Sequence, residues 1–305
     1  MRHTTLKPNA LLHLSKKIVI LLTGAGGQLG QCFQQLATQY PPGTFYPTGS
    51  DILDISDRPT VLRFFENNPL SCCINCAAYT GVDKAESEPA IARRINVQGV
   101  KNLAEACARI GIPLIHFSTD YVYHSRQNTP FREEDPVRPK GVYARTKLAG
   151  ERAALKAYPG AMVIRTSWVY ARQGHNFVNT MLRLGRERAE IKVVFDQIGT
   201  PTYAPDLAEA VMTIIQQLDN KAITKESLAG IWHYSNEGVT SWYDFAKAIF
   251  EIKKIPCMAL PIETKDFPTP ARRPPFSVLN KGKIKDAFGL DIPHWRDSLR
   301  RCLEI

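Results

Sequence analysis

Three side chains along this sequence have the chemistry needed to protonate a carbonyl oxygen. Thr119 ends an apolar run, Tyr143 follows 24 residues later, and Lys147 comes four residues after Tyr143. When a hydride reduces a ketone, charge develops on the carbonyl oxygen, and a positioned acid must protonate it. A tyrosine can supply the proton, and a threonine hydroxyl can hold the oxygen. A lysine ammonium and an oxidised nicotinamide lower the pKa of such a tyrosine. Tyrosine and lysine at this spacing also occur on ordinary helix surfaces.

The elements around these residues decide whether they can meet. The segment "VYARTKLAGERAALKAYP" predicts a helix, which places Tyr143 and Lys147 one turn apart on one face. The run "PLIHF" predicts a strand, so Thr119 and Asp120 fall at its carboxyl end, where ligands of open α/β sheets bind. The alternative is that residues 118–120 form a polar turn that binds nothing.

A glycine-rich turn near the start of the chain predicts nucleotide binding. The stretch "TGAGGQLG" follows the predicted strand "KIVILLTG" and opens a predicted helix. Gly24 permits the tight turn, Gly27 lets the backbone approach a pyrophosphate, and Gly30 lets helix and strand pack closely. The helix N-terminus then presents free N–H groups to the phosphates.

The end of the second predicted strand bears on the choice between NADH and NADPH. An acidic residue there binds the ribose hydroxyls of NAD and repels the 2′-phosphate of NADP. Gly49 and Ser50 stand where that acid is expected, and Asp51 comes one or two residues late. The small turn therefore admits a phosphate and favours NADPH without excluding NADH. Asp51 is alternatively a turn or cap residue, while Asp54 and Ile55 are better placed to border the adenine.

Alternating strand and helix patterns predict an α/β fold, a Rossmann-type doubly wound parallel sheet. The pattern runs through residues 18–169, which we interpret as the NAD(P)-binding domain, with a returning segment at about 205–240. In this domain "AMVIRTSWVY" predicts one strand and "PAIARRINVQGVKNLAEACARIG" one helix. The rhythm loosens afterwards, so residues 170–204 and 241–305 predict a smaller substrate-binding lobe over the carboxyl ends of the strands.

Composition bounds the remaining possibilities. The chain has 305 residues, 44% of them hydrophobic and 22% charged, as in ordinary globular proteins. Its apolar run at 18–22 is too short to span a bilayer, and residues 1–17 predict a leader outside the fold. The seven scattered cysteines argue against a disulfide framework and for a reducing, cytoplasmic compartment. A net charge of +10 suits an anionic ligand; we expect neither nucleic acid nor a membrane as a partner.

With these motifs in place, the sequence resembles the extended short-chain dehydrogenase/reductases, and within them the dTDP-4-dehydrorhamnose reductase branch. The matching stretches are "TGAGGQLG", "INCAAYTGVDKAESEP", "INVQGVKNLAEAC", "STDYVY", "YARTKLAGE", "RTSWVY", "NFVNTMLRL", "DQIGTPT" and "PTPARRP". "VDKAESEP" and "RTSWVY" have no generic structural explanation and separate this branch from the sugar epimerases. The resemblance implies reduction of dTDP-4-dehydro-β-L-rhamnose to dTDP-β-L-rhamnose with NADPH or NADH. This reaction is the last step in making a sugar donor for surface polysaccharide.

The resemblance also implies roles for the matching residues. Thr119, Tyr143 and Lys147 would form the catalytic set, with Tyr143 as proton donor and Lys147 also holding the cofactor's ribose. Besides the three glycines, Asp54 and Ile55, the cofactor would contact Gln28, Leu29, Ala77, Ala78, Tyr79, Tyr143 and Lys147. The substrate would contact Thr80, Val82, Thr119, Asp120, Tyr121, Trp168, Asn176 and Arg273. Trp168 is alternatively a core aromatic, and Arg273 a surface cation.

Two departures from the family pattern affect these expectations. Ala144 replaces the glycine of the motif usually written YGxTK, and since alanine suits a helix better we expect no loss. Some family members form a metal-linked dimer through glutamates, whereas the matching positions here are Cys32 and Pro205. Neither residue replaces a carboxylate as a ligand for magnesium. We therefore expect no structural metal and a monomer or weak homodimer.

Two other interpretations fit much of the same pattern. One is a reductase or synthase acting on a related dTDP-4-keto sugar, as in dTDP-dihydrostreptose formation, and the motifs do not separate it from the first. The other is a non-catalytic regulator, because the regulatory subunit of methionine adenosyltransferase resembles the same branch. The intact set of Thr119, Tyr143 and Lys147 counts against a regulator.

Overall fold

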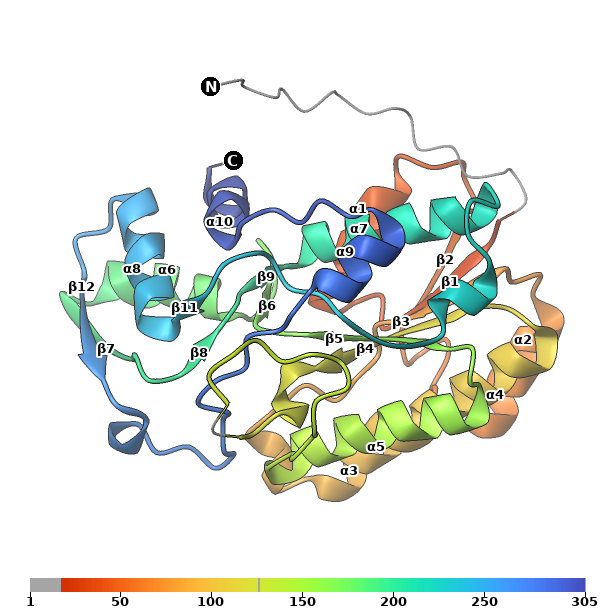
Figure 1. Ribbon diagram of the computed structural model, residues 1–305, viewed down its shortest axis with the longest axis horizontal. Helices are drawn as coiled ribbons and strands as arrows, with labels where there is room; N and C mark the ends of the chain where they lie inside the picture. The colour runs from red at the N-terminus through yellow and green to blue at the C-terminus, as the bar shows by residue number, and fades with distance from the viewer. Residues whose placement is uncertain (1–17, 126, 305) are drawn as a thin grey trace.

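A parallel six-stranded sheet forms the centre of the computed structural model, which describes residues 18–125 and 127–304 (Figure 1). The predicted leader lies outside the described residues. The strands, in chain order, are β1 (Ile20–Thr23), β2 (Phe45–Thr48), β3 (Cys72–Asn75), β4 (Leu114–Thr119), β5 (Met162–Thr166) and β10 (Gly230–His233). Their spatial order is β10-β5-β4-β3-β1-β2, and every pair runs parallel. The predicted Rossmann-type α/β class is confirmed.

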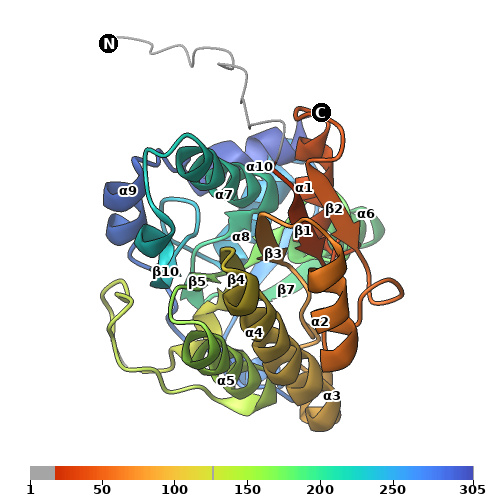
Figure 2. The same cartoon turned by 90° about the vertical axis from the view of Figure 1, so that its right-hand side faces the viewer.

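Helices cover both faces of this sheet, as Figure 2 shows. One face carries α1 (Gln28–Ala37), α7 (Ala204–Asp219) and α9 (Gly282–Phe288); the other carries α2 (Arg58–Asn67), α4 (Val100–Ile110) and α5 (Gly141–Ala157). Successive strand residues point to opposite faces. Ile20 and Leu22 accordingly pack into the α1–α7 core, and Leu21 packs into the α2–α4 core. Burial on both faces explains why this strand is a continuous apolar run.

The strand order reverses next to β1, and this reversal fixes where a ligand can bind. From β1 the chain first crosses to β2 on one side and then to β3 on the other. The two crossovers therefore leave a crevice at the carboxyl ends of β1 and β3. Gly24 follows β1 and Cys76 follows β3, so the glycine-rich turn lies at this crevice.

A second hydrophobic core lies beyond the carboxyl ends of the strands, at the left in Figure 1. It is built by α6 (Phe177–Glu187), α8 (Trp242–Lys253) and α10 (Trp295–Leu303), with β7 (Glu190–Val194) paired parallel to β12 (Met258–Ile262). Short pairs join β6 (Val169–Tyr170) to β9 (Thr202–Tyr203) and β8 (Ile198–Gly199) to β11 (Thr240–Ser241). Helix α9, however, packs on the main sheet through Ile284 and Phe288. The predicted domain boundaries stay a prediction.

Two predicted elements differ in detail from the structure. The single strand predicted over 161–170 is wrong: β5 ends at Thr166 and β6 begins at Val169. Trp168 between them has φ +47°, a left-handed value that breaks the strand. The helix predicted over 89–111 exists as α3 (Pro89–Arg93), a π-helical segment (Arg94–Gly99) and α4. Such π segments often mark functional sites.

Candidate active site

The side chains predicted to do chemistry meet in one cleft of about 510 Å³ at the carboxyl ends of the strands, here called the central cleft. Predicted ligand contacts that line it are Gly27, Gln28, Leu29, Gly30, Ala78, Thr80, Val82, Thr119, Asp120, Tyr121, Tyr143, Lys147 and Trp168. The cleft is also lined by Asn75, Cys76, Ser118, Thr166, His175 and Trp242, which sequence reasoning did not select. The strand ends and one face of α5 thus bring distant residues together.

Thr119 and Tyr143 form the polar pair at the floor of the central cleft. Thr119 is the last residue of β4 and Tyr143 lies in the first turn of α5, and both side chains line the central cleft. Burial raises the pKa of Tyr143 to about 12, although the neighbouring Thr119 hydroxyl opposes this rise. The Tyr121 ring packs edge-on against Tyr143 with centroids 5.8 Å apart. The phenol is therefore protonated near neutral pH and available as a proton donor.

Lys147 lies one helical turn after Tyr143 but is held by the backbone of β4. Its Nζ donates to the carbonyl oxygen of Phe117 at 2.7 Å. Burial lowers the pKa of Lys147 to about 8, and the charges of Glu151 and Cys76 act against this shift. The expectation that Lys147 and an oxidised nicotinamide together lower the pKa of Tyr143 stays a prediction. Burial dominates the tyrosine, and its neighbouring charge, Asp120, raises the pKa further.

Asp120 is a buried carboxyl group beside the catalytic pair. Thr119 Oγ1 lies 3.1 Å from Asp120 Oδ1, and among residues 18–125 and 127–304 no group hydrogen-bonds Asp120 Oδ2. Burial raises the pKa of Asp120 to about 7, and hydrogen bonds from Ser277 and Thr119 limit the rise. Its unpaired oxygen suits a hydroxyl group of a bound sugar.

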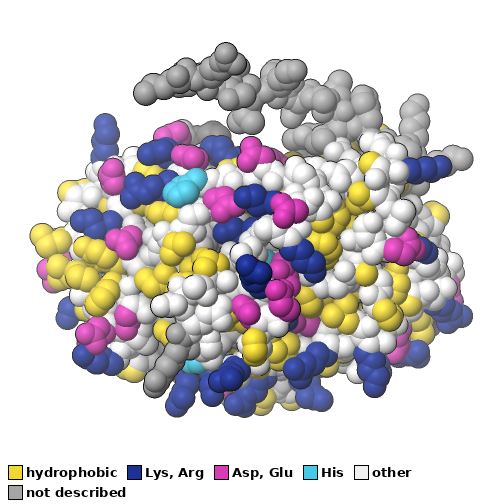
Figure 3. Space-filling model, in the orientation of Figure 1, with side chains coloured by type: hydrophobic (Ala, Val, Ile, Leu, Met, Phe, Trp, Pro, Cys, Tyr) yellow, Lys and Arg dark blue, Asp and Glu magenta, His cyan; other side chains and the backbone are white. Residues whose placement is uncertain are grey.

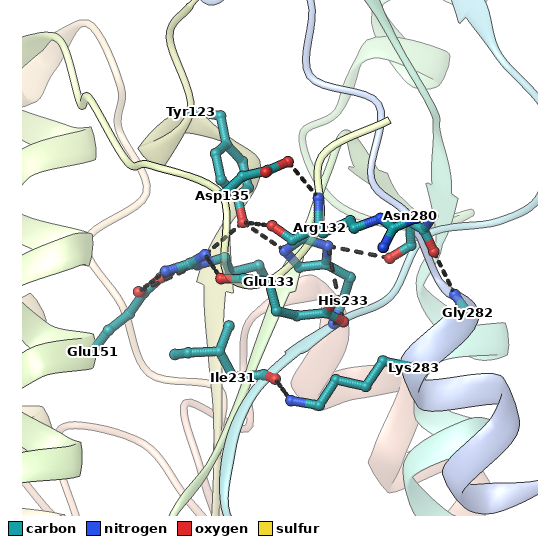
Figure 4. Close-up of polar contacts among 11 residues, drawn as sticks. Tyr123, Arg132, Glu133, Asp135, Glu151, Ile231, His233, Asn280, Gly282 and Lys283 are labelled. Carbon is teal, nitrogen blue, oxygen red and sulfur yellow. Dashed lines mark hydrogen bonds and ion pairs between the residues drawn. The ribbon is translucent and has the colours of Figure 1, made fainter. Parts of the chain in front are cut away.

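A buried polar network supports the cleft from behind (Figure 4). Ser118 donates to Glu151 on α5, and Glu151 pairs with Arg165 of β5 at 2.7 Å, with both charged side chains almost fully buried. Arg165 also donates to the Tyr123 hydroxyl at 2.6 Å, which lies 2.8 Å from His233 Nε2. Burial lowers the pKa of His233 to about 3, so this histidine is neutral. The network fixes α5, β5 and β10 relative to the strand end that carries Thr119.

A second cleft of about 680 Å³ lies on the other side of the glycine-rich turn, and we call it the dinucleotide cleft. Gly24 has φ +65°, and a Cβ there would lie 2.4 Å from the backbone nitrogen of Ala77. At Gly30 a Cβ would lie 2.4 Å from the Gly24 carbonyl oxygen. The N-terminus of α1 follows with no side-chain cap, so its N–H groups stay available. Ala77 and Ala78 also line this cleft, and the cradle fits the pyrophosphate of a dinucleotide.

The adenosine end of the dinucleotide cleft contains acidic and basic groups. Asp51, Asp54 and Ile55 line it, as does Arg94 from the π-helical segment. The carboxylate of Asp54 accepts bonds from the backbone and hydroxyl of Ser56, which hold its pKa below the usual value. Arg94 is exposed and could pair with a phosphate, a role that the sequence alone did not suggest.

Asn96 in the π-helical segment holds the loop that connects the two clefts. Its Oδ1 accepts from the Tyr79 backbone at 2.8 Å, and its Nδ2 donates to the Tyr79 carbonyl and to Thr146 on α5. The Tyr79 hydroxyl donates to Glu88 at 2.7 Å. In the sequence, Asn96 lies in the family-matching stretch "INVQGVKNLAEAC", but nothing there indicated its contacts with Tyr79.

Of the other predicted substrate contacts, Trp168 lines the central cleft, whereas Asn176 and Arg273 do not. Trp168 stacks on Trp242 with centroids 3.5 Å apart and planes 8° apart. Trp242 also lines a neighbouring apolar pocket of about 760 Å³, as does Arg273. Asn176 lines neither space: it caps α6, and its amide nitrogen donates to Gln28 Oε1 at 2.8 Å. Its contact with substrate stays a prediction.

Cys32 and Pro205 line the same cleft, between α1 and α7. In the part of the chain that the structure describes, no three His, Cys, Asp or Glu side chains are arranged to hold a metal ion. No helix within the described ranges is long and apolar enough to cross a membrane. The absence of a metal stays a prediction.

Charge is distributed rather than gathered on the visible surface. On the face in Figure 3, basic and acidic side chains are interspersed over most of the area. Neighbouring opposite charges form ion pairs, such as Arg58 with Glu105 and Lys285 with Glu237.

A doubly wound sheet, a glycine-rich turn at its switch point and a Thr–Tyr–Lys set at the strand ends define an extended short-chain dehydrogenase/reductase. The comparisons with known proteins narrow this class. Residues 18–305 match the family model described as RmlD substrate binding domain, and the chain belongs to this family.

Individual relatives agree with this assignment. A dTDP-4-dehydrorhamnose reductase of Sinorhizobium fredii is 41% identical over 288 residues, which cover 93% of this chain and 96% of the relative. The Escherichia coli protein of the same name is 39% identical over 294 residues, with 93% and 96% covered. A Bacillus anthracis dTDP-4-dehydrorhamnose reductase, solved in complex with NADP, is 37% identical with a TM-score of 0.86. That alignment covers 94% of this chain and 98% of the solved chain.

Proposed function

We propose that this chain reduces the 4-keto group of dTDP-4-dehydro-β-L-rhamnose to give dTDP-β-L-rhamnose, with NADPH or NADH as reductant. The observation that carries the proposal is that Thr119 and Tyr143 line the same central cleft, with Lys147 one helical turn further on. Relatives about 40% identical over nearly their whole length carry the name of this reductase. The reaction is an oxidoreductase step that completes the synthesis of a nucleotide sugar.

The cofactor would lie across the two clefts. The Gly24–Gly30 turn and the open N-terminus of α1 would hold its pyrophosphate, and Asp54 and Ile55 would border the adenosine. Lys147 and Tyr143 would bind at the nicotinamide ribose. When bound, the nicotinamide supplies the hydride that reduces the keto carbon.

The protein's own groups would manage the proton and the developing charge. Tyr143, protonated because its pKa is about 12, would donate its proton to the carbonyl oxygen as that oxygen becomes basic. The Thr119 hydroxyl would bond the same oxygen and orient the keto group. The Lys147 ammonium would stabilise the tyrosinate left behind, since its own pKa of about 8 keeps much of it charged near neutrality.

The substrate would extend from the central cleft toward the apolar pocket. The sugar would lie near Thr80, Val82, Asp120 and Tyr121, which line the cleft around Tyr143. Beyond it, Trp242 borders both spaces, and Phe177 and Met181 offer an apolar surface for a pyrimidine base. Residues 18–169 with the returning segment would then hold the cofactor, and the remaining segments the nucleotide sugar. We place this reaction in the cytoplasm and assign no membrane partner.

Replacement of the proposed proton donor tests the mechanism. Tyr143→Phe removes one hydroxyl and little volume, so we expect NADPH binding to persist while kcat falls by about 10²-fold or more. Turnover is measured with dTDP-4-dehydrorhamnose and each nicotinamide, with identification of the product. Undiminished kcat in this variant would refute the assignment. Formation of a different sugar by the wild type would point to a related dTDP-4-keto sugar.

A further inference from the structure

Asp83, in the loop after β3, holds an arginine that lies 190 residues further along the chain. Its Oδ2 accepts from Arg273 Nη2 at 2.7 Å, and its Oδ1 accepts from Nη1 at 3.1 Å. Oδ1 also accepts from the backbone nitrogen of Ala271 at 3.1 Å. The carboxylate therefore grips the end of the guanidinium with two parallel bonds, the strong geometry for an arginine–carboxylate pair.

The other contacts of Arg273 fix its plane and leave one edge open. Nη1 also donates to Thr269 Oγ1 at 2.5 Å and to the Ala271 carbonyl at 2.9 Å. Within residues 18–125 and 127–304, Arg273 makes no other hydrogen bond, so Nε–H and the second Nη2–H have no acceptor. These two N–H groups lie on the same edge of the planar guanidinium and can bind two phosphate oxygens together.

Arg273 lies beside the path that a nucleotide sugar would take between the two spaces. It lines the apolar pocket beside Trp242, and its charge acts on Tyr121, which lines the central cleft. Val82, next to Asp83, lines the central cleft as well. A ligand with its sugar at Tyr143 and its base in the apolar pocket must pass its diphosphate between the two spaces, where Arg273 lies.

We propose that Asp83 is a positioning residue that orients Arg273 so that its free edge binds the diphosphate of the nucleotide sugar. The inference rests on the proposed function for the choice of a dTDP-linked ligand. Asp83 also brings a negative charge near the phosphates. Because its side chain is 40% exposed, solvent and salt weaken that repulsion, and the gain from a preset arginine outweighs it.

The test measures nucleotide binding apart from chemistry. Asp83→Asn keeps the shape but places an amide NH₂ or a weaker acceptor opposite Nη2. We expect the Kd for dTDP, from calorimetry, and the KM for the keto sugar to rise by about tenfold, the loss of one charge-assisted bond. We expect kcat to stay within about twofold and the Kd for NADPH to be unchanged, since Asp83 contacts neither the catalytic side chains nor the residues of the dinucleotide cleft. Glu263→Gln, which removes an exposed acid paired with Lys265, is the matched control.

A double-mutant cycle separates positioning from a merely structural contact. Arg273→Lys keeps the charge but cannot present two donors on one edge, so it should weaken dTDP binding by a similar factor. If Asp83 acts through Arg273, Asp83→Asn should then change the Kd by less than about twofold in the Arg273→Lys background. Circular dichroism and Tm establish that each variant is folded. If Asp83→Asn does not fold, Arg273→Lys alone still tests whether the two N–H groups on one edge of Arg273 bind the diphosphate.

The outcomes distinguish this inference from the proposed function. If the wild type reduces the keto sugar and Asp83→Asn binds dTDP as tightly as the wild type or more tightly, positioning by Asp83 is refuted. If Asp83→Asn lowers the Tm but leaves the Kd for dTDP and the KM unchanged, the pair only stabilises the fold and the inference is equally wrong. If the wild type binds dTDP through this pair but reduces no dTDP-4-keto sugar, the proposed function fails and the inference stands.

Discussion

Replacement of Glu151 should cost considerable stability without removing a catalytic hydroxyl. The Glu151 side chain is 2% exposed, and its carboxylate accepts from Ser118 and from Arg165 Nε at 3.0 Å and pairs with Arg165 Nη2 at 2.7 Å. Glu151→Gln keeps the volume but leaves the Arg165 guanidinium buried and without its counter-charge. Breaking a buried pair in this way costs about 3–5 kcal/mol.

The loss should be visible in both unfolding and catalysis. At about 2 °C per kcal/mol for a large domain, we expect Tm to fall by roughly 5–10 °C in calorimetry. The charge of Glu151 also raises the pKa of Lys147. The other titratable groups near the Lys147 ammonium are Cys76 and His116. Without the Glu151 charge the lysine pKa should fall below about 8, so the alkaline limit of kcat/KM should move to lower pH.

A paired replacement serves as the control for this argument. Glu151→Leu combined with Arg165→Met removes both charges and leaves apolar groups of similar size. It should be less destabilising than Glu151→Gln, because no isolated charge remains buried. A Tm for Glu151→Gln within about 2 °C of the wild type, or a double variant that is the less stable of the two, would refute the reasoning.

Two further predictions concern the cofactor and pH. Arg94→Gln should raise the KM for NADPH by about tenfold while changing that for NADH by less than twofold, if Arg94 binds the 2′-phosphate; equal effects in the two titrations would exclude that role. Asp120, whose pKa rises from 3.8 to about 7 on folding, keeps a proton that the unfolded chain releases between these values. Stability should therefore fall as pH rises from about 4 to 7, and Asp120→Asn should remove up to about 4 kcal/mol of that decline. Denaturant unfolding at pH 4 and pH 8 measures it, and parallel curves for both proteins would contradict the shift.

The parts of the site that could be predicted are those set by local spacing. Gly24 and Gly30 follow a strand and open a helix, so their tight contacts are implied by the strand–turn–helix pattern. Tyr143 and Lys147 share a face because four residues make about one helical turn. Thr119 ends a strand whose neighbours are parallel, which brings it to the same edge of the sheet as the glycine-rich turn.

Features set by tertiary contacts could not be predicted in this way. Asp83 and Arg273 are joined across 190 residues, and no period or spacing connects them. The π-helical turn that turns Asn96 toward Tyr79 has the same apolar pattern as an α-helix. The left-handed backbone of Trp168 interrupts a segment whose sequence is typical of a strand. Trp168 stacks on Trp242, which lies in a helix more than 70 residues later, and local sequence does not indicate that contact.

The pKa of Tyr143 shows why residue type and spacing do not settle a mechanism. A lysine one turn away suggested a tyrosine poised to ionise, yet burial raises the pKa to about 12 and the lysine's nearest partner is the Phe117 carbonyl. For a reduction this is the useful state, because the group must hold its proton until the carbonyl oxygen becomes basic. The lysine then acts mainly after transfer, when it stabilises the phenolate. The reverse oxidation requires the ionised tyrosine and should therefore need a higher pH than reduction does.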